Sequence, residues 1–443
     1  GKFWKKEEAD LVINKTKKGK AIVESIESKQ FSQLPPHPFD LTTLQLESYR
    51  ALRISPKETL EIAQALYLAG IISYPRTSSN QLPVSLGYKK IIESLKKNND
   101  YKLLAESLLK QDKLFPNNGK KVDAAHPAIY PTGEIPTKGT DRELKLYDLI
   151  VKRTLATFAP QAIRETQTIT IDVNSELFLA SGTITKEKGW HIYYEPYVPY
   201  KNDELPVLKN KQELKVQSIN LLSKETQAPK RYTPASIIKD LDKKNLGTKA
   251  TRSAVIDTLY QRYYIQNESI EATDLGFKTI ETLEKYCPEI INEKLTKHFE
   301  KEMNMIQANK KHEQEILDEA QTILKKIFLK FKENEVNIGN ALYEANVITA
   351  NEQSIVGLCD KCKNNLRIMY SKKNRQYFVA CSNYPSCKNT FSVPRNALIK
   401  PSKNTCKECN YPTVLVIRKG NRPFEYCINK NCKTKEQYKT NTV

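Results

Sequence analysis

The cysteines constrain the fold of this chain most, because eight of the nine lie between Cys359 and Cys432, near its C-terminal end. They form two sets of four: Cys359-x2-Cys362 with Cys381-x5-Cys387, and then Cys406-x2-Cys409 with Cys427-x4-Cys432. Two close pairs flanking a short β-hairpin are the pattern of a tetrahedral zinc site with four thiolates. The sequence therefore predicts two structural zinc ribbons in tandem in preference to a disulfide framework, each dependent on its metal for folding. Cys287 stands alone and is expected to be a small buried hydrophobic residue.

The ribbon region is also strongly basic. From Ile355 to the end there are 18 Lys plus Arg against 4 Asp plus Glu, within a chain of formal net charge +20. Aromatic residues are interleaved with these charges, namely Tyr370, Tyr377, Tyr384, Phe391, Tyr411, Phe424 and Tyr426. Exposed rings on a basic strand pair stack on unpaired bases, so the pattern indicates a single-stranded nucleic acid partner. The alternative is that about half of these rings only fill the thin ribbon cores.

Length and hydropathy limit the classes of protein to which the chain can belong. At 443 residues the chain is long enough for two or more domains. It has no run of 18 or more apolar residues and no hydrophobic leader, so neither a membrane span nor secretion is expected, and we expect a cytoplasmic location. It begins with Gly-Lys-Phe-Trp, so we expect a processed chain, a fragment or one part of a longer product.

One tyrosine among the 23 is placed for chemistry. Tyr74 lies in the string Gly70-Ile-Ile-Ser-Tyr-Pro-Arg-Thr-Ser-Ser-Asn80, after a predicted helix from Pro56 to Ala69. Pro75 favours an extended backbone, so Arg76 should lie on the same side as Tyr74. A phenol with a pKa of about 10 needs cationic help to attack phosphorus, and a guanidinium fork can hold the phosphate. A phosphotyrosine preserves the phosphodiester energy, which agrees with the lack of a Gly-rich loop followed by Lys-Ser or Lys-Thr.

This string resembles the active-site segment of type IA DNA topoisomerases, which runs tyrosine, any residue, arginine, threonine, then usually aspartate and serine. The resemblance implies that Tyr74 is the nucleophile and that Arg76 holds the scissile phosphate, and we assign Thr77 and Ser79 to DNA contacts. Ser78 departs from the usual aspartate. The loss of that carboxylate removes a local charge partner for Arg76.

Two further strings are similar to the same family. Ala124-Ala-His-Pro-Ala-Ile-Tyr-Pro-Thr-Gly133 is like its histidine motif. A lone histidine is usually structural, but the resemblance implies that His126 serves the scissile phosphate as a hydrogen-bond donor or proton-transfer partner, with Asp123 placed to orient it. Gly247-Thr-Lys-Ala-Thr-Arg252 resembles a segment at a helix N-terminus, where Lys249, Thr251 and Arg252 suit a DNA phosphate. Tyr263 stands where this segment's following turn usually has glycine.

The resemblance implies an α+β, multidomain architecture: the ring domains of a type IA topoisomerase without the Toprim domain, followed by two ribbons. Period-two stretches at 20–28, 168–173, 177–185 and 213–219 predict the strands of an antiparallel arch, and helical periodicity predicts a long helix ending near Lys332. The expected order is the first part of the arch (1–40), the tyrosine domain (41–159), the return of the arch (160–228), a helical DNA-binding base (229–335), a linker (336–354), and ribbons at 355–398 and 402–438. His191 is expected to be a solvent-facing strand residue.

The family's Toprim domain, which supplies a glutamate and an Asp-x-Asp set for magnesium, has no counterpart in the sequence. Asp240-Leu241-Asp242 is the nearest match, but it lies in a predicted helix where residues two apart point to different faces. Magnesium and its ligands are therefore expected in a Toprim-bearing polypeptide or segment outside this chain.

The leading interpretation is the cleavage, gate and ribbon part of an archaeal, ATP-independent type IA topoisomerase. It would act in the nucleoid on single-stranded or negatively supercoiled DNA through a 5′-phosphotyrosine at Tyr74. The rival is a non-catalytic binder of single-stranded DNA or RNA that kept the fold after losing its metal site. Half of a reverse gyrase is disfavoured, because helicase motifs are absent and tandem C-terminal ribbons are unusual there.

Overall fold

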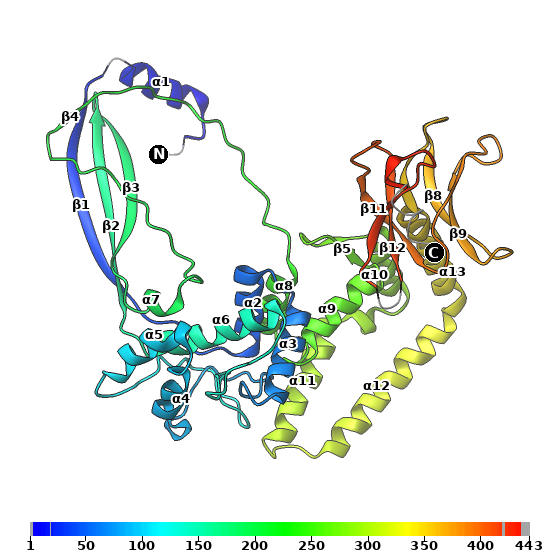
Figure 1. Cartoon of the computed structure of the whole chain (residues 1–443), viewed down its shortest axis with the longest axis horizontal. Helices are drawn as coiled ribbons and strands as arrows, with labels where there is room; N and C mark the ends of the chain where they lie inside the picture. Colours follow the sequence, from blue (N-terminus) through cyan, green and yellow to red (C-terminus); the bar gives the residue numbers. More distant parts are fainter. Residues whose placement is uncertain (1–2, 18, 419–420, 436–443) are drawn as a thin grey trace. The chain divides into compact units, whose positions relative to one another are not determined.

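The structure is a computed structural model that describes residues 3–17, 19–418 and 421–435. It separates into two compact units. Unit 1 consists of Gly1–Leu259, Asn267–Ile270 and Thr296–Asn304, and unit 2 of Tyr260–Gln266, Glu271–Leu295 and Met305–Val443. Helices and antiparallel strands occupy separate stretches of the chain, which confirms the predicted α+β class (Figure 1).

Unit 1 contains a four-stranded antiparallel sheet of order β3-β2-β1-β4. The long strands are β1 (Ala21–Gln33), β2 (Ala162–Val173) and β3 (Glu176–Glu187), which lie side by side in Figure 1. The register pairs Ala21 with Val173 and Gln33 with Ala162, so the first predicted strand lies beside a segment that is remote in sequence. The prediction for 213–219 is wrong beyond its first two residues, because only β4 (Glu213–Leu214) pairs with β1.

The expectation for His191 is also wrong. It begins the short helix α7 (His191–Tyr194) and is 5% exposed. Trp190 Nε1 donates a hydrogen bond of 3.1 Å to the carbonyl of Gln33, and the His191 ring lies 3.0 Å from the Gln33 side-chain oxygen. The end of β1 therefore draws this segment inward, which a local alternation of polar and apolar residues does not reveal.

The helices of unit 1 begin at recognisable caps. They are α1 (Lys6–Thr16), α2 (Leu41–Leu52), α3 (Pro56–Leu68), α4 (Tyr88–Leu95), α5 (Asn99–Leu109), α6 (Asp141–Thr157) and α8 (Pro234–Lys243), with a 3₁₀ turn at Val84–Leu86. Asp40, Thr140 and Thr233 form capping boxes for α2, α6 and α8, and Ser55 caps α3 with Pro56 in the first turn. The helix start predicted at Pro56 is confirmed. Helices α9 (Arg252–Gln261) and α11 (Glu293–Gln307) contribute residues to both units.

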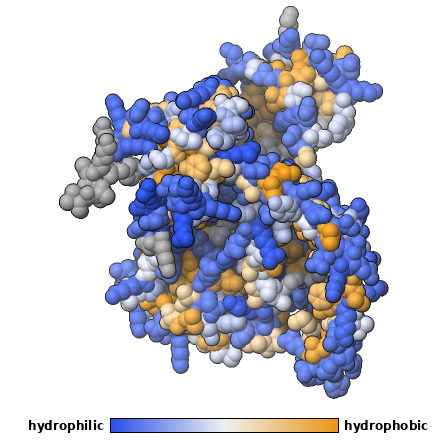
Figure 2. All heavy atoms as spheres, turned by 90° about the vertical axis from the view of Figure 1, so that its right-hand side faces the viewer, coloured by the Kyte–Doolittle hydropathy of each residue, from blue (hydrophilic) through white to orange (hydrophobic). Residues whose placement is uncertain are grey.

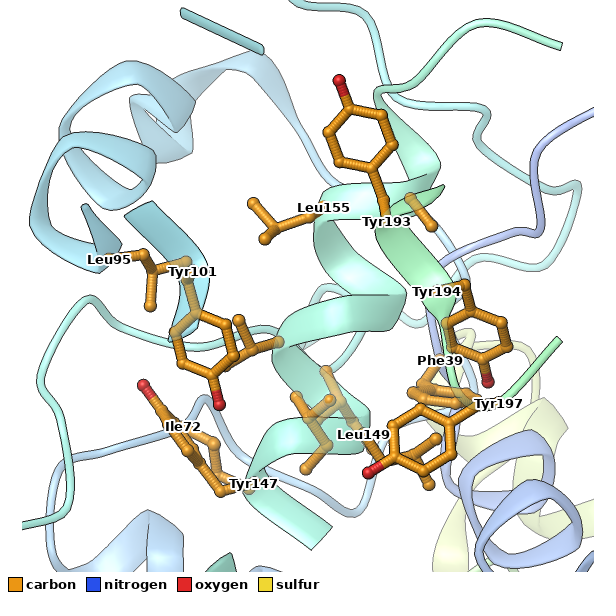
Figure 3. Close-up of a cluster of buried hydrophobic side chains, with 14 of the residues drawn as sticks. Phe39, Ile72, Leu95, Tyr101, Tyr147, Leu149, Leu155, Tyr193, Tyr194 and Tyr197 are labelled. Carbon is orange, nitrogen blue, oxygen red and sulfur yellow. The ribbon is translucent and has the colours of Figure 1, made fainter. Parts of the chain in front are cut away.

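The core of unit 1 forms around α6, whose Leu149, Ile150 and Leu155 are fully buried. Tyr101, Tyr194 and Tyr197, from neighbouring segments, belong to this cluster (Figure 3). Their hydroxyls meet carboxylates: Tyr101 and Tyr197 donate to Asp148 at 3.0 and 2.6 Å. Burial first, and then Asp148, raises the pKa of Tyr101 and Tyr197 well above the usual range, so these phenols stay protonated. Tyr101 and Tyr197 are therefore structural tyrosines.

Unit 2 begins with a two-residue ladder of β5 (Ile265–Gln266) and β6 (Glu271–Ala272), followed by α10 (Asp274–Tyr286) and a 3₁₀ turn at Pro288–Ile291. The long helix predicted to end near Lys332 is α12 (Glu313–Glu333). A break separates it from α11, where Asn309 takes a φ of 54° and Lys310 N bonds to Met305 O. Residues 336–354, expected as a linker, lie almost wholly in α13 (Glu335–Gln353). This helix packs against α10, which accounts for its order.

The two ribbons form one packed body. The first has strands β7 (Ile355–Leu358), β8 (Asn365–Ser371), β9 (Gln376–Cys381) and β10 (Thr390–Ser392); the second has β11 (Leu398–Thr405), β12 (Pro412–Ile417) and β13 (Phe424–Cys427), before a 3₁₀ turn at Lys433–Lys435. The hairpins predicted for both are confirmed. A single hydrophobic cluster joins them: Val356, Leu366, Val379, Phe391 and Val393 with Ile399, Val414, Val416 and Ile428. Tyr411 also donates a 2.5 Å hydrogen bond to Asp360 of the first ribbon.

The turn at Tyr263 keeps a left-handed backbone without glycine. Tyr263 has a φ of 58° and is 44% exposed. This conformation costs a residue with a side chain roughly 1–2 kcal/mol, whereas glycine adopts it freely but loses about 0.5–1 kcal/mol in chain entropy. We therefore expect Tyr263→Gly to raise the free energy of unfolding by about 0.5–1 kcal/mol in urea titrations. Asn309→Gly, with a φ of 54°, is the matched control and should change little, since asparagine tolerates this region. A loss of stability in Tyr263→Gly would show that ring packing outweighs the backbone cost.

On the face shown in Figure 2, hydrophilic side chains predominate and hydrophobic ones gather in smaller patches. None of the helices in the described part of the chain is long and apolar enough to cross a membrane.

Candidate functional site

Tyr74 lies where α3 ends and the chain turns back. Gly70 takes a φ of 74°, and Ile71 N bonds to Leu66 O, which closes the helix. Ile72 then pairs with Pro131 in an isolated antiparallel bridge, and Ser73 N donates 2.9 Å to the carbonyl of Tyr130. Backbone pairing therefore holds the tyrosine segment against the histidine segment, which comes much later in the sequence.

The pairing brings the two predicted reactive rings together. The centroids of the Tyr74 and His126 rings are 4.5 Å apart with an interplanar angle of 46°. On another side Tyr67, from α3, meets Tyr74 edge-on at 5.2 Å. Tyr74 is half-buried and contacts both rings. Sequence reasoning missed Tyr67, although its place in the last turn of α3, the helix that leads to Tyr74, was a signal for it.

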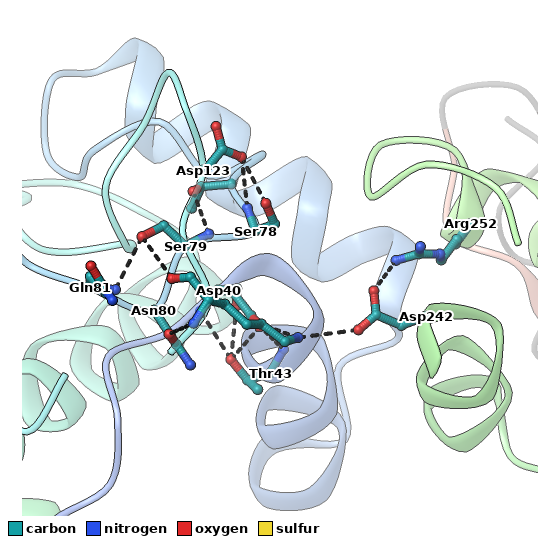
Figure 4. Close-up of polar contacts among 11 residues, drawn as sticks. Asp40, Thr43, Ser78, Ser79, Asn80, Gln81, Asp123, Asp242 and Arg252 are labelled. Atoms are coloured by element: carbon teal, nitrogen blue, oxygen red, sulfur yellow. Dashed lines mark hydrogen bonds and ion pairs between the residues drawn. The ribbon is translucent and has the colours of Figure 1, made fainter. Parts of the chain in front are cut away.

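Thr77 and Ser79 hold the loops to each other. Thr77 Oγ1 donates 3.1 Å to the carbonyl of His126 and accepts from Ser79 N at 3.0 Å. Ser79 Oγ lies 3.5 Å from the carbonyl of Lys121. The two residues are 1% and 3% exposed, so their hydroxyls are engaged inside the protein; Figure 4 shows Ser79 among these contacts. Their assignment to DNA contacts remains a prediction.

Arg76 offers donors for an anion. Its side chain is partly exposed, and its Nε is buried with no hydrogen-bond partner among the residues that the structure describes. A buried N–H of this kind costs free energy unless it is satisfied, and a phosphate oxygen is the acceptor that a guanidinium fits best. The side chain thus suits the phosphate role that the sequence predicts for it.

Asp123 is a centre of hydrogen bonds in the same place. Its Oδ2 accepts from Ser78 N at 3.1 Å and Ser78 Oγ at 3.0 Å, as Figure 4 shows, and it pairs with the ammonium of Lys249. Its Oδ1 accepts from the backbone N–H groups of Ala125 and His126 at 3.1 and 3.3 Å. The tyrosine loop, the histidine loop and the Gly247–Arg252 segment therefore meet at one carboxylate.

The other residues predicted in the Gly247–Arg252 segment have local roles. Arg252 is 8% exposed, donates 3.0 Å from Nε to the carbonyl of Leu246 and pairs with Asp242. Thr251 Oγ1 accepts from Thr248 N at 3.1 Å. Of the three predicted DNA-contacting side chains, Lys249 is the one that reaches the loops around Tyr74. DNA contacts of Thr251 and Arg252 remain predictions.

The Asp240-Leu241-Asp242 sequence does not form a metal site. Asp240 accepts from the Tyr232 hydroxyl at 3.0 Å, whereas Asp242 pairs with Lys121 at 3.3 Å and with Arg252. The two carboxylates have separate partners, as expected for residues two apart on α8. Within the described ranges, the only groups of three or more side chains suited to a metal are the two cysteine sets.

Each cysteine set has the geometry of a zinc site. The four sulfurs of each set lie within 4.8 Å of one another. A tetrahedral Zn–S distance of about 2.3 Å requires sulfurs about 3.8 Å apart. The observed contacts are 3.8 Å for Cys359–Cys387, 3.3 Å for Cys362–Cys381, 3.6 Å for Cys406–Cys432 and 3.5 Å for Cys409–Cys427. The predicted zinc ligands therefore converge in two C4 sites.

Comparison with known proteins agrees with both parts of the chain. Residues 1–318 match the DNA topoisomerase family, and residues 356–396 match the topoisomerase DNA binding C4 zinc finger. This chain belongs to the type IA DNA topoisomerase family. The topoisomerase match extends over the arch, the tyrosine and histidine loops and the helices that follow, so the family resemblance read from short motifs is confirmed.

Individual relatives show how much of a topoisomerase is present. DNA topoisomerase 1 of Pyrococcus horikoshii is 44% identical over 439 residues, which are 98% of this chain and 63% of that protein. DNA topoisomerase 1 of Methanocaldococcus jannaschii is 45% identical, covering 98% of this chain and 56% of that protein. Full-length topoisomerase I from Thermotoga maritima shares the fold with a TM-score of 0.56 at 21% identity, covering 91% of this chain and 64% of that structure. The chain thus spans about three fifths of the archaeal relatives it matches.

Proposed function

We propose that this chain is the cleavage, gate and zinc-ribbon part of an ATP-independent type IA topoisomerase. The observation that carries the proposal is the contact between the Tyr74 and His126 rings, at 4.5 Å, in a segment where the Arg76 Nε–H has no acceptor among the described residues. A nucleophile, a proton carrier and a phosphate clamp are the protein groups that phosphoryl transfer to a tyrosine needs.

Tyr74 Oη attacks the scissile phosphorus, and the bond from phosphorus to the 3′-oxygen breaks. The products are a 5′-phosphotyrosine and a free 3′-hydroxyl, which later attacks the same phosphorus and releases the tyrosine. Arg76 holds the non-bridging oxygens and offsets the charge that builds on them. His126 donates a hydrogen bond to the phosphate or carries the proton between the phenol and the leaving oxygen. Both steps exchange one phosphodiester for another, so no ATP is required.

Magnesium belongs elsewhere in this scheme. The described residues contain no carboxylate cluster that fits it, and the near match at Asp240 and Asp242 is committed to cationic partners. The proposal therefore assigns magnesium to a Toprim-bearing polypeptide or segment outside this chain. The relatives' additional length is consistent with such a part.

The other regions have roles in strand passage. We assign the antiparallel arch to the gate that lets the tyrosine domain lift from the helical base, within the domain limits expected from the sequence. The basic, aromatic ribbons would capture single-stranded DNA of a negatively supercoiled, nucleoid-associated substrate. Tyr370 is 52% and Tyr384 is 70% exposed, and both suit base stacking.

A second candidate function is binding of single-stranded DNA or RNA without cleavage. The lack of a magnesium site among the described residues favours it, and the basic ribbons are sufficient for it. It predicts salt-sensitive, sequence-tolerant binding that does not depend on Tyr74.

Complementation with a Toprim polypeptide separates the two functions. The chain would be mixed with magnesium, a Toprim-bearing fragment of an archaeal relative and a labelled single-stranded oligonucleotide, and then denatured. We expect a covalent protein–DNA adduct that peptide mass spectrometry maps to Tyr74, together with relaxation of negatively supercoiled plasmid. Reactions without Toprim or with a magnesium chelator are the controls and should give neither product. Failure to form an adduct with all components present, while the oligonucleotide binds, would reject cleavage in favour of the binding function.

A further inference from the structure

Asp123 was expected from the sequence only to orient His126, yet its carboxylate contacts the tyrosine loop at Ser78, the histidine loop at His126 and the side chain of Lys249. We infer that Asp123 is the positioning carboxylate of this site, which fixes the Lys249 ammonium and the His126 loop relative to the Tyr74 loop. The inference rests on the proposed function, because it names the residue that assembles the site for cleavage.

The contacts of Asp123 exceed what a structural cap requires. Its side chain is 7% exposed and accepts four hydrogen bonds from Ser78, Ala125 and His126, at 3.0 to 3.3 Å, besides the ion pair with Lys249. A carboxylate has about four lone-pair sites, so both oxygens are fully engaged. The position of Ser78 is the one where the family pattern usually has aspartate. Asp123 thus brings a carboxylate to the same loop from the neighbouring segment.

Asp123 remains charged in this setting. Burial acts to raise the pKa of its carboxyl, but hydrogen bonds from Lys249 and from the Ser78 and Ala125 amides lower it well below the usual range. Because the pKa is lowered, the link to Lys249 is present at neutral and mildly acidic pH and is lost only in strong acid.

The ion pair with Asp123 has a direct consequence for Lys249. A free lysine loses rotamer entropy when its side chain is ordered. Asp123 removes this cost before DNA binds, because it already holds one face of the ammonium while the side chain keeps 33% exposure. An ammonium has three donors, so the remaining ones can meet a phosphate oxygen. Lys249 is thereby presented at the loop that carries Tyr74 and Arg76.

An opposite interpretation makes a different prediction. If the carboxylate only competed with DNA for Lys249, its removal would strengthen DNA binding and speed cleavage. If it positions Lys249 and the histidine loop, its removal leaves binding nearly unchanged and slows cleavage, since small misplacement of reacting groups costs about 10²-fold.

The test compares three variants of the chain. Asp123→Asn removes the charge at constant shape. Asp123→Ser combined with Ser78→Asp returns a carboxylate to the tyrosine loop. Asp141→Asn is the matched control, since Asp141 is an exposed carboxylate paired with Lys145 at 2.8 Å on α6. Thermal unfolding and zinc content establish that each variant is folded.

The first measurement needs no activity. A limiting acylating reagent modifies lysines, and mass spectrometry compares Lys249 with the exposed Lys89 of α4 in the same molecule. We expect Lys249 to react roughly three to ten times faster in Asp123→Asn, which corresponds to the loss of an ion pair worth about 1 kcal/mol. In Asp123→Ser combined with Ser78→Asp, the reactivity of Lys249 should return to the wild-type level. Unchanged reactivity of Lys249 in Asp123→Asn would overturn the inference.

The second measurement uses the Toprim-complemented reaction. Asp123→Asn should form the Tyr74 adduct about 10²-fold more slowly, with affinity for single-stranded DNA within about threefold of wild type. Cleavage equal to the Asp141→Asn control, or tighter binding with faster cleavage, would also overturn the inference. If the wild-type chain itself gives no adduct, the proposed function fails, whereas the Lys249 reactivity still decides the pairing. Should Asp123→Asn not fold, Lys249→Gln replaces it, with the same expected loss of cleavage.

Discussion

Tyr74→Phe is expected to abolish formation of the covalent DNA adduct and plasmid relaxation, with a loss of at least about 10⁴-fold in the Toprim-complemented reaction. Removing one hydroxyl leaves the ring, and with it the contacts to His126 at 4.5 Å and Tyr67 at 5.2 Å. The loop should therefore keep its structure while losing its nucleophile. Denaturing gels and plasmid topoisomer gels measure the two losses, and fluorescence anisotropy should show unchanged binding of single-stranded DNA.

Tyr343→Phe is the matched control for this substitution. Tyr343 is 71% exposed on α13, so the same chemical change there should leave cleavage at the wild-type rate. An adduct that persists in Tyr74→Phe would place the nucleophile elsewhere. Unchanged relaxation in Tyr74→Phe would contradict the assignment in the same way.

Cys381→Ser is expected to disorder both ribbons, although Cys381 belongs to the first site alone. Zinc contributes roughly 10–16 kcal/mol to the folding of such small domains, and a lost thiolate removes much of that. The first ribbon then loses its side of the shared core, in which Val379 and Leu366 pack with Val414 and Val416 of the second. We expect zinc content to fall from two ions to one or fewer per chain, and amide exchange to accelerate in β12 and β13 as well as in β8 and β9.

Cys287→Ala is the control for the zinc experiment. Cys287 is fully buried in unit 2 but lies outside both cysteine sets, so this variant should keep two zinc ions and normal exchange in the ribbons. Wild-type protection of β12 and β13 in Cys381→Ser would show that the ribbons fold independently. Loss of single-stranded DNA affinity should accompany the disorder, because the basic aromatic strands would no longer form a surface.

Much of the fold was predictable because the signals are local. Thr140 with Glu143, and Thr233 followed by Pro234, mark helix starts through contacts within one turn. The ribbon hairpins follow from alternation between cysteine pairs, and the eight thiolates converge as their spacing predicts. The remaining errors occur where a distant segment alters a local preference. α13 is helical against α10 where a linker was expected, and the end of β1 buries His191.

The candidate site also combines residues that were recognisable from the sequence with contacts that were not. Tyr74, Arg76 and His126 were found from their own strings, because a reactive side chain is recognisable by its type and neighbours. The contacts of Asp123 with Ser78 and Lys249, and those of Tyr67, could not be read from a motif, since they join residues that are remote in sequence or belong to another element. Serine at position 78, where the family usually has aspartate, was a signal in the sequence. Only the tertiary structure shows that the carboxylate of Asp123 bonds to this serine.

The amino-acid sequence was enough to indicate the family, the candidate nucleophile, the two zinc sites and the lack of a recognisable Toprim carboxylate motif, because each depends on residue type and spacing along one segment. Folding was needed to establish that one buried carboxylate gathers Ser78, His126 and Lys249, and that two ribbons share a single core. Hydrogen bonds and apolar contacts act over a few ångströms, so they join residues according to position in space, whatever their separation in the chain.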